Sequence, residues 1–229
     1  MWRNKISVLP AVSLVELLIS LALGSLLLSA AAALYSHIYL QQTKYRELIN
    51  LQAHTHQLLD YLNQHIQHMN LQGQPHPDSN YALFQHQGKN YHLIHQSCLL
   101  FFNDVNQDGC VGNRIKSESC HLNGMNNTNE VGKELFGFKF ENQAIYVFND
   151  DSAIRRCHQT QCEKVLTSCQ HHLWHNLVEQ SDYRVDMLRF QWEIPERLLN
   201  IELALTSLKQ PEIRYQAQAY SYLFNGAPE

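Results

Sequence analysis

The first 40 residues change from a short basic segment to a long apolar one. No ionisable side chain occurs between Leu17 and Leu34. A helix starting near Val12 rises about 1.5 Å per residue, enough to cross a hydrocarbon core roughly 30 Å thick. Arg3 and Lys5 precede this segment without an acidic residue, so the positive-inside rule predicts a cytoplasmic N-terminus. We therefore expect a single-pass transmembrane helix over 12–40, with the remaining chain on the extracytoplasmic side.

Residues 41–73 keep helical spacing but become polar. One apolar stripe recurs at three- and four-residue steps or their multiples, formed by Tyr45, Leu48, Leu59, Leu62, Ile66 and Met69. Gly73, Pro75 and Pro77 are typical helix-ending residues. The pattern predicts an amphipathic continuation of the first helix, with one face packed against another layer.

From residue 80 onward the pattern changes to short apolar or alternating runs separated by Asn, Asp, Gly and Pro. These runs cover 91–104, 137–150, 183–194, 197–207 and 213–224. The run 183–194 is the most regular, and we expect its apolar residues mostly on one face: Val185, Leu188, Phe190, Trp192 and Ile194. The chain is therefore predicted to be α+β, with a β-rich extracytoplasmic head over 80–229 whose antiparallel sheet covers the helix.

Glu16 is an acidic residue inside the apolar segment. A cleaved secretory signal, with a cut site near Ser29–Leu34, has an apolar run of about 7 to 15 residues, shorter than this one. A plain membrane anchor explains the length but not the charge, which costs about 2.5 to 3.5 kcal/mol at a helix centre and less near its end. Glu16 therefore needs a specific explanation.

The six residues 11–16, Ala-Val-Ser-Leu-Val-Glu, resemble the N-terminus of type IV prepilins and type II secretion pseudopilins. In that family a basic leader ends in a small residue, usually Gly, and is followed by Phe-Thr-Leu-Ile-Glu and an apolar helix. The resemblance implies that prepilin peptidase removes residues 1–11 by cutting after Ala11 and that the new amine of Val12 is methylated. Two residues depart from this pattern, Ala11 in place of Gly and Val12 in place of Phe, and Ala is also small enough for cleavage.

The same resemblance implies a role for Glu16 in assembly. Once subunits pack helix against helix in a fibre, its carboxylate can pair with the N-terminal ammonium of a neighbouring subunit. Desolvation consumes much of the Coulomb energy of a buried pair, so such a pair is expected to set register more than stability.

The segments "SCLLFFNDVNQDG" and "LRFQWEI" are similar to the larger minor pseudopilins, the prepilin peptidase-dependent protein B, PilW and J-type group. This implies a non-enzymatic minor subunit in the assembly or tip of a type IV pilus or competence pseudopilus, serving DNA uptake, adhesion or secretion. Expected partners are other pilin-like subunits, prepilin peptidase and an inner-membrane platform protein. The expected location is the bacterial inner membrane with a periplasmic head, then the fibre. The alternative is a membrane-anchored periplasmic binding module that never polymerises.

Six cysteines fall in the predicted head: Cys98, Cys110, Cys120, Cys157, Cys162 and Cys169. An even number outside the cytoplasm favours disulfides, although sequence cannot choose among fifteen connectivities. Local bridges are expected among the last three, and Cys98 with Cys110 could close a turn. The alternative is zinc bound by the last three cysteines and a histidine from His171, His172 or His175, but the spacing matches no paired-ligand motif.

Asp104, Asn106, Asp108 and Gly109 match the opening of an EF-hand calcium loop. The twelfth position would be Ile115, where a bidentate acid is required, so Glu118 or a distant carboxylate would have to complete the site. An Asp-Gly turn between strands needs the same residues for backbone reasons. Calcium is therefore a candidate cofactor and the turn its alternative.

Composition and motifs offer little for other functions. Nucleotide-binding, serine-hydrolase and zinc-protease motifs are absent from the sequence. With 17 Lys and Arg against 21 Asp and Glu, the net charge is −4, and the basic residues are not clustered. Direct nucleic-acid binding is therefore not expected.

Overall fold

The computed structural model describes residues 13–69, 73, 77–115, 118–148, 156–167, 169, 174–178 and 182–223. The chain divides into two compact units, Met1–Arg46 and Glu47–Glu229, and each is described by itself. The predicted leader 1–11 lies outside the described residues.

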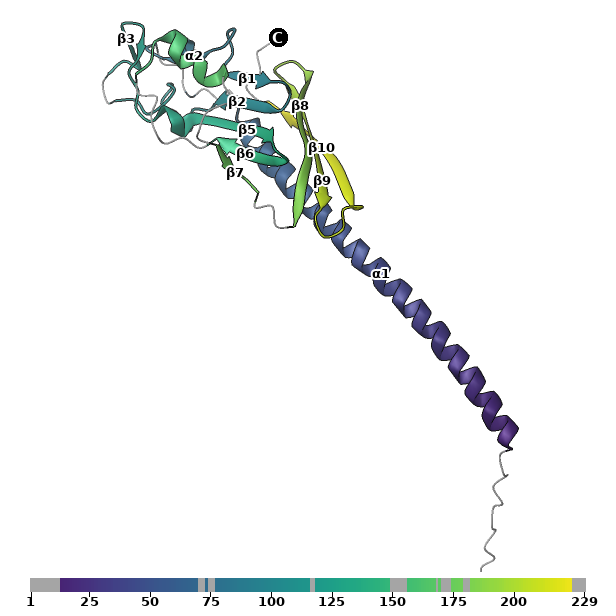
Figure 1. The fold of residues 1–229 in the computed structure, drawn as a ribbon. Coiled ribbons are helices and arrows are strands. Elements are labelled where there is room, and N and C mark those ends of the chain that lie inside the picture. Colours follow the sequence, from purple (N-terminus) through teal and green to yellow (C-terminus); the bar gives the residue numbers. More distant parts are fainter. Residues whose placement is uncertain are drawn as a thin grey trace, which may run out of the picture. The chain divides into compact units, whose positions relative to one another are not determined.

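Helix α1 (Leu14–Gln67) begins in the first unit and ends in the second (Figure 1). It is long and apolar enough to cross a membrane. None of the described residues of the first unit is buried, and Leu27, for example, is 72% exposed. The apolar surface of this unit is therefore available to lipid or to other helices.

The second part of α1 presents one buried stripe to the head, made by Leu51, Thr55, Leu59, Leu62 and Ile66. The predicted stripe is confirmed at its C-terminal end, where Met69 just beyond the helix is also buried. It is wrong at Tyr45, which is 63% exposed. Packing begins one to two turns later than the pattern indicated, and the helix ends at Gln67, before the predicted stop at Gly73.

A five-stranded antiparallel sheet has the order β1-β2-β5-β6-β7. Its strands are β1 (Tyr91–Ile94), β2 (Cys98–Phe102), β5 (Leu135–Glu141), β6 (Ala144–Phe148) and β7 (Trp174–Asn176). The sequence runs 91–104 and 137–150 each fold as a hairpin rather than one strand, with turns at positive φ, as at Gln96 and Gln143.

A three-stranded antiparallel sheet has the order β10-β9-β8, from β8 (Tyr183–Ile194), β9 (Leu198–Ser207) and β10 (Arg214–Tyr222). The register of β8 on β9 shifts between Val185 and Met187. Because side chains alternate along a strand, this bulge is what lets Val185 and Leu188 both face the core. A second shift lies between Trp192 and Ile194, and Ile194 is 50% exposed, against expectation.

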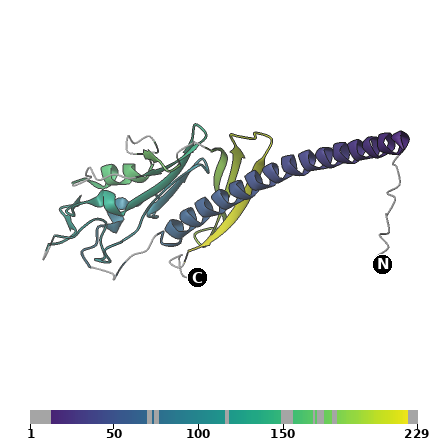
Figure 2. The same cartoon turned by 90° about the horizontal axis from the view of Figure 1, so that it is seen from below.

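The five-stranded sheet is covered on both faces. Leu99 and Phe101 of β2 join the core shared with α1 and the three-stranded sheet, while Leu100 and Phe102 join a second core. That second core includes residues of the 3₁₀ helix η1 (Tyr81–Phe84) and helix α2 (Gln159–Thr167). Figure 2 shows α1 and α2 on opposite sides of this sheet. Burial on both faces explains why the β2 sequence is continuously apolar. The predicted α+β class is confirmed.

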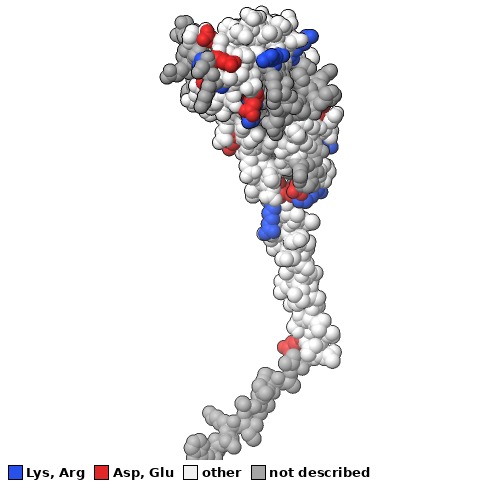
Figure 3. Space-filling view, turned by 90° about the vertical axis from the view of Figure 1, so that its left-hand side faces the viewer, with Lys and Arg blue, Asp and Glu red and all other residues white. Residues whose placement is uncertain are grey.

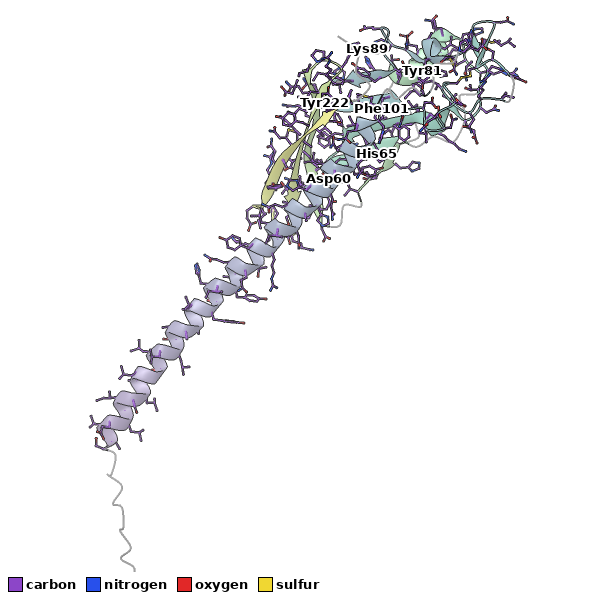
Figure 4. All side chains as sticks on the ribbon, turned by 180° about the vertical axis from the view of Figure 1, so that it is seen from behind. Asp60, His65, Tyr81, Lys89, Phe101 and Tyr222 are labelled. Atoms are coloured by element: carbon purple, nitrogen blue, oxygen red, sulfur yellow. A yellow bond between two sulfur atoms is a disulfide. The ribbon has the colours of Figure 1, made fainter. Side chains whose placement is uncertain are left out.

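The remaining elements are short. Strands β3 (His121–Leu122) and β4 (Met125–Asn126) form a two-stranded ladder, and the 3₁₀ helix η2 (Val131–Glu134) leads into β5. Aromatic contacts join α1 to the five-stranded sheet: His65 lies 6.1 Å from Phe136 and 5.9 Å from Phe138 between ring centroids (Figure 4).

We expect Leu62→Ala to lower the free energy of unfolding of the head by about 2 to 5 kcal/mol, because it leaves a cavity where the side chain is fully buried. Chemical denaturation of the full-length protein in detergent measures this loss. The matched control is Leu27→Ala in the exposed part of α1, which should leave head unfolding unchanged. Equal effects of the two substitutions would contradict the division of the helix into packed and unpacked parts.

Candidate functional site

The N-terminus of α1 is closed by a reciprocal pair of hydrogen bonds. The backbone N–H of Ser13 donates to Glu16 Oε2 at 3.1 Å, and the backbone N–H of Glu16 donates to Ser13 Oγ at 3.2 Å. This is a capping box, which satisfies two amide donors that the first helical turn leaves without partners. Ser at the cap and Glu three residues later were present in the sequence, but the prediction for Glu16 considered only its charge.

Glu16 is the single Asp, Glu, Lys or Arg among the described residues from Ser13 to Thr43. Its side chain is exposed, and the large apolar side chains around it are also more than half exposed. Figure 3 shows this part of α1 as an uncharged surface with one acidic spot near the start of the described chain. The expected cleavage and methylation residues Ala11 and Val12 lie outside the described residues.

The loop after β2 is organised around carboxylate oxygens that accept backbone N–H groups. Asp104 is 1% exposed, and its Oδ2 accepts from Gly109 at 2.9 Å while Oδ1 accepts from Asp108 at 3.2 Å. Asn106 Oδ1 accepts from Asp108 at 2.8 Å, and Asp108 Oδ1 accepts from Cys110 at 3.0 Å. Gly109 has φ 80°, a conformation that favours glycine. These bonds form the turn predicted as the alternative to calcium.

The same loop brings the calcium candidates Asp104, Asn106 and Asp108 together. No group of three or more His, Cys, Asp or Glu side chains suited to a metal is found in the part of the chain that the structure describes. The candidate set would need the amide oxygen of Asn106 as a ligand, which is compatible with calcium chemistry. Calcium binding therefore stays a prediction.

Glu134, at the end of η2, is a buried carboxylate beside this loop. It is 3% exposed; its Oε2 accepts the N–H of Gly112 at 2.6 Å and its Oε1 that of Asn106 at 3.4 Å. Burial raises the pKa of Glu134 to about 7, with the negative charges of Asp104 and Asp108 acting in the same direction and the two hydrogen bonds opposing it. Glu134 was not predicted as a site residue, because nothing local in its sequence indicates that it reaches this loop.

All six cysteines form disulfides, Cys98–Cys169, Cys110–Cys120 and Cys157–Cys162. The suggested Cys98–Cys110 bridge is wrong, because Cys98 points into the second core, beside the end of α2. The zinc alternative is also wrong, because none of its three cysteines has a free thiolate. The Cys157–Cys162 bridge is local, as expected, while Cys110–Cys120 closes the segment that follows the Asp104 loop.

A long apolar helix that continues into the core of an antiparallel β head is the layout of pilin-like proteins. Residues 44–223 match the family described as prepilin peptidase-dependent protein B, and the chain belongs to this family. The match lies outside residues 11–16, so it supports the resemblance drawn from those residues independently.

An uncharacterised protein of Haemophilus influenzae (strain ATCC 51907 / DSM 11121 / KW20 / Rd) is similar to this chain, with 31% identity over 134 residues. The matched region spans 56% of each protein. No solved structure matches the chain.

The raised pKa of Glu134 predicts a pH-dependent stability of the head. The folded state holds a proton that the unfolded state releases above about pH 4.5, so stability is full below that pH and falls as pH rises through about 7. We expect Glu134→Gln to remove this decline, on the order of 3 kcal/mol, in denaturation curves measured from pH 4 to 8. A difference in unfolding free energy between wild type and variant that stays constant with pH would contradict this role of Glu134.

Calcium binding would lower the pKa of Glu134, which is opposite to the effect of burial. A cation held by Asp104, Asn106 and Asp108 would favour the ionised form of Glu134 and raise the melting temperature at pH 7 and above. We expect calcium, but not an equal concentration of sodium, to produce this increase, and Asp108→Asn to reduce it. A melting temperature that calcium leaves unchanged would reject the calcium prediction and leave the loop as a structural turn.

Proposed function

We propose that this protein is a minor pilin-like subunit that takes part in the assembly or tip of a type IV pilus or competence pseudopilus. The main supporting observation is that the described part of the helix before Glu47 exposes its apolar side chains, such as Leu27 at 72%. Membership of a prepilin peptidase-dependent family supports the same proposal. Lipid would cover this surface before assembly, and helices of neighbouring subunits would cover it in the fibre.

Processing and charge pairing complete the proposal at the N-terminus. Cleavage after Ala11 would make Val12 the first residue, placing an ammonium one residue before Ser13. The Glu16 carboxylate, whose Oε2 is held by the Ser13 N–H, would then be oriented at the helix start, where the amine of a neighbouring subunit can reach it. The capping box and the intersubunit pair are compatible, because a carboxylate can accept several hydrogen bonds.

The proposed partners are other pilin-like subunits, prepilin peptidase and an inner-membrane platform protein. The proposed location is the inner membrane with the head in the periplasm, where three disulfides are stable. DNA uptake is favoured over adhesion and secretion by the resemblance of the head segments. Direct contact with DNA is not part of the proposal, since the charge is −4 and the basic side chains are dispersed.

The second candidate is a membrane-anchored periplasmic module that does not polymerise. The exposed helix favours it equally, because lipid alone can cover such a surface. The two candidates differ in what Glu16 does: an anchor only tolerates the charge, whereas a fibre subunit depends on it.

We expect Glu16→Gln to reduce incorporation of the protein into sheared surface fibres by at least about tenfold, equivalent to a loss of about 1.4 kcal/mol per assembled subunit. Gln keeps the oxygen that accepts the Ser13 N–H and removes only the charge. Quantitative immunoblotting of fibre and membrane fractions measures incorporation, and denaturation curves should show an unchanged head.

The matched control is Ser13→Ala, which weakens the helix cap by about 1 kcal/mol but keeps the Glu16 charge. It should leave incorporation near the wild-type level. A wild-type protein that is absent from fibres would favour the non-polymerising module. A Glu16→Gln variant that is incorporated normally would contradict the proposed charge pair at Glu16.

A further inference from the structure

Strand β10 forms one edge of the three-stranded sheet and leaves a row of backbone groups without partners among the residues that the structure describes. Its register on β9 is uninterrupted from Arg214↔Thr206 to Tyr222↔Leu198. Just beyond its two ends, Ser207 N–H donates to Ile213 O at 3.0 Å and Leu223 N–H to Arg197 O at 2.9 Å. Hydrogen-bonded pairs alternate with non-bonded pairs in an antiparallel ladder. The odd-numbered residues of β10 therefore bond to β9, and the even-numbered ones direct their N–H and C=O groups away from it.

The outward groups belong to Arg214, Gln216, Gln218 and Tyr220. No described residue makes a backbone hydrogen bond to them. Their side chains are exposed as well, and Tyr220 is 49% exposed. An unpaired strand edge of this kind is satisfied either by water or by another extended strand.

The opposite edge of the same sheet, formed by β8, is closed. Phe190 N–H donates to the carbonyl of Gln96 at 2.8 Å, and Val185 N–H donates to that of Gln143 at 3.2 Å. Both carbonyls come from hairpin turns of the five-stranded sheet. Two register shifts also interrupt β8, and bulges hinder further strand pairing.

Strand β10 has none of these protections along most of its length. From Tyr215 to Tyr222 it contains no charge, no proline and no register shift. Natural proteins usually place charges, proline or bulges on an edge that must stay unpaired. The contrast with β8 indicates that the β10 edge is kept open for a partner strand without charge.

The direction of β10 restricts which strand can pair. Tyr215 OH lies 3.2 Å from His56 Nε2, and β10 runs from there toward the C-terminal end of α1 (Figure 2). In the proposed fibre the subunits are stacked head to tail, so their helices and their β10 strands run in the same direction. Parallel pairing of two β10 edges would need a twofold axis along the strands, which a head-to-tail stack lacks. Antiparallel pairing of two β10 edges would require opposite directions.

We propose that the β10 edge, from Arg214 to Tyr220, binds an uncharged edge strand of a pilin-like subunit of a different sequence, extending the three-stranded sheet across a subunit boundary. This inference rests on the proposed function, since it needs neighbouring subunits. Main-chain hydrogen bonds would supply affinity, and contacts with exposed side chains such as Tyr220 would supply specificity.

Hydrogen exchange of the full-length protein, compared between detergent-solubilised monomer and sheared fibres, tests the pairing. The outward amides of β10 should exchange at least about tenfold more slowly in fibres, whereas β8 amides already bonded in the monomer should change little. Unchanged β10 exchange in a chain that is present in fibres would overturn this inference alone. Absence of the chain from fibres would overturn the proposed function and this inference together.

Substitutions at the two edges provide a matched comparison. Gln218→Lys puts a charge beside the outward groups of β10, while Gln191→Lys adds the same charge to an exposed position of β8. We expect only Gln218→Lys to remove the slower exchange, with both variants unfolding like the wild type. Equal effects of the two variants would contradict a specific role for β10.

A photoreactive benzoylphenylalanine at Gln216 identifies the occupant by mass spectrometry of the cross-linked product from intact cells. An adduct with a different pilin-like subunit, mapped to an uncharged strand, supports the proposal. An adduct with a second copy of this chain, or no adduct in cells that make fibres, overturns it.

Discussion

The apolar side chains at the start of α1 have no partner within the described chain, and this constraint governs the rest of the structure. A helical surface of exposed Leu, Ile, Val and Ala is unstable in water and must be covered by lipid or by other helices. The head therefore has to fold around a separate core, using only the later turns of α1. Helix α1 is exposed before Glu47 and buries one face in the head from Leu51 onward.

The head meets this requirement with two cores on either side of one sheet. Strand β2 contributes side chains to both cores, which makes it the centre of the head. The three disulfides lie at β2, at α2 and in the loops around them, and Cys98, Cys157 and Cys162 are part of the second core. The buried carboxylates of Asp104 and Glu134 shape the loop after β2 by accepting backbone N–H groups. Burial is the main cause of the raised pKa of Glu134.

Regular periodicity made the larger elements predictable. The helix and the strands β8 and β10 were found from the sequence, because each has one face more buried than the other and a clear repeat. Strand β9, which is buried along most of its length, was found as a short apolar run. The β1–β2 and β5–β6 hairpins were not separated, since burial on both faces of the sheet removes the alternation. Val185 and Leu188 are three residues apart and can face the same core only because of the bulge. A strict two-residue repeat in the sequence does not predict such a bulge.

Features that depend on contacts between distant parts of the chain were harder to predict from the sequence. The Cys98–Cys169 bridge joins residues 71 positions apart, and no spacing rule specifies it. Tyr45 continued the helical stripe in sequence, but its side chain is 63% exposed. Glu134 was overlooked because its importance comes from burial beside the Asp104 loop. The open β10 edge became evident only when β9 was identified as its one neighbour in the sheet.

The proposed role of Glu16 requires a free ammonium on a neighbouring subunit, and therefore removal of the leader. The intact mass of the protein isolated from its native membrane tests this requirement directly. A mature chain that begins at Val12 and carries one additional methyl group is the predicted result. A protein that retains residues 1–11, or one that begins near Ala32, would contradict the account.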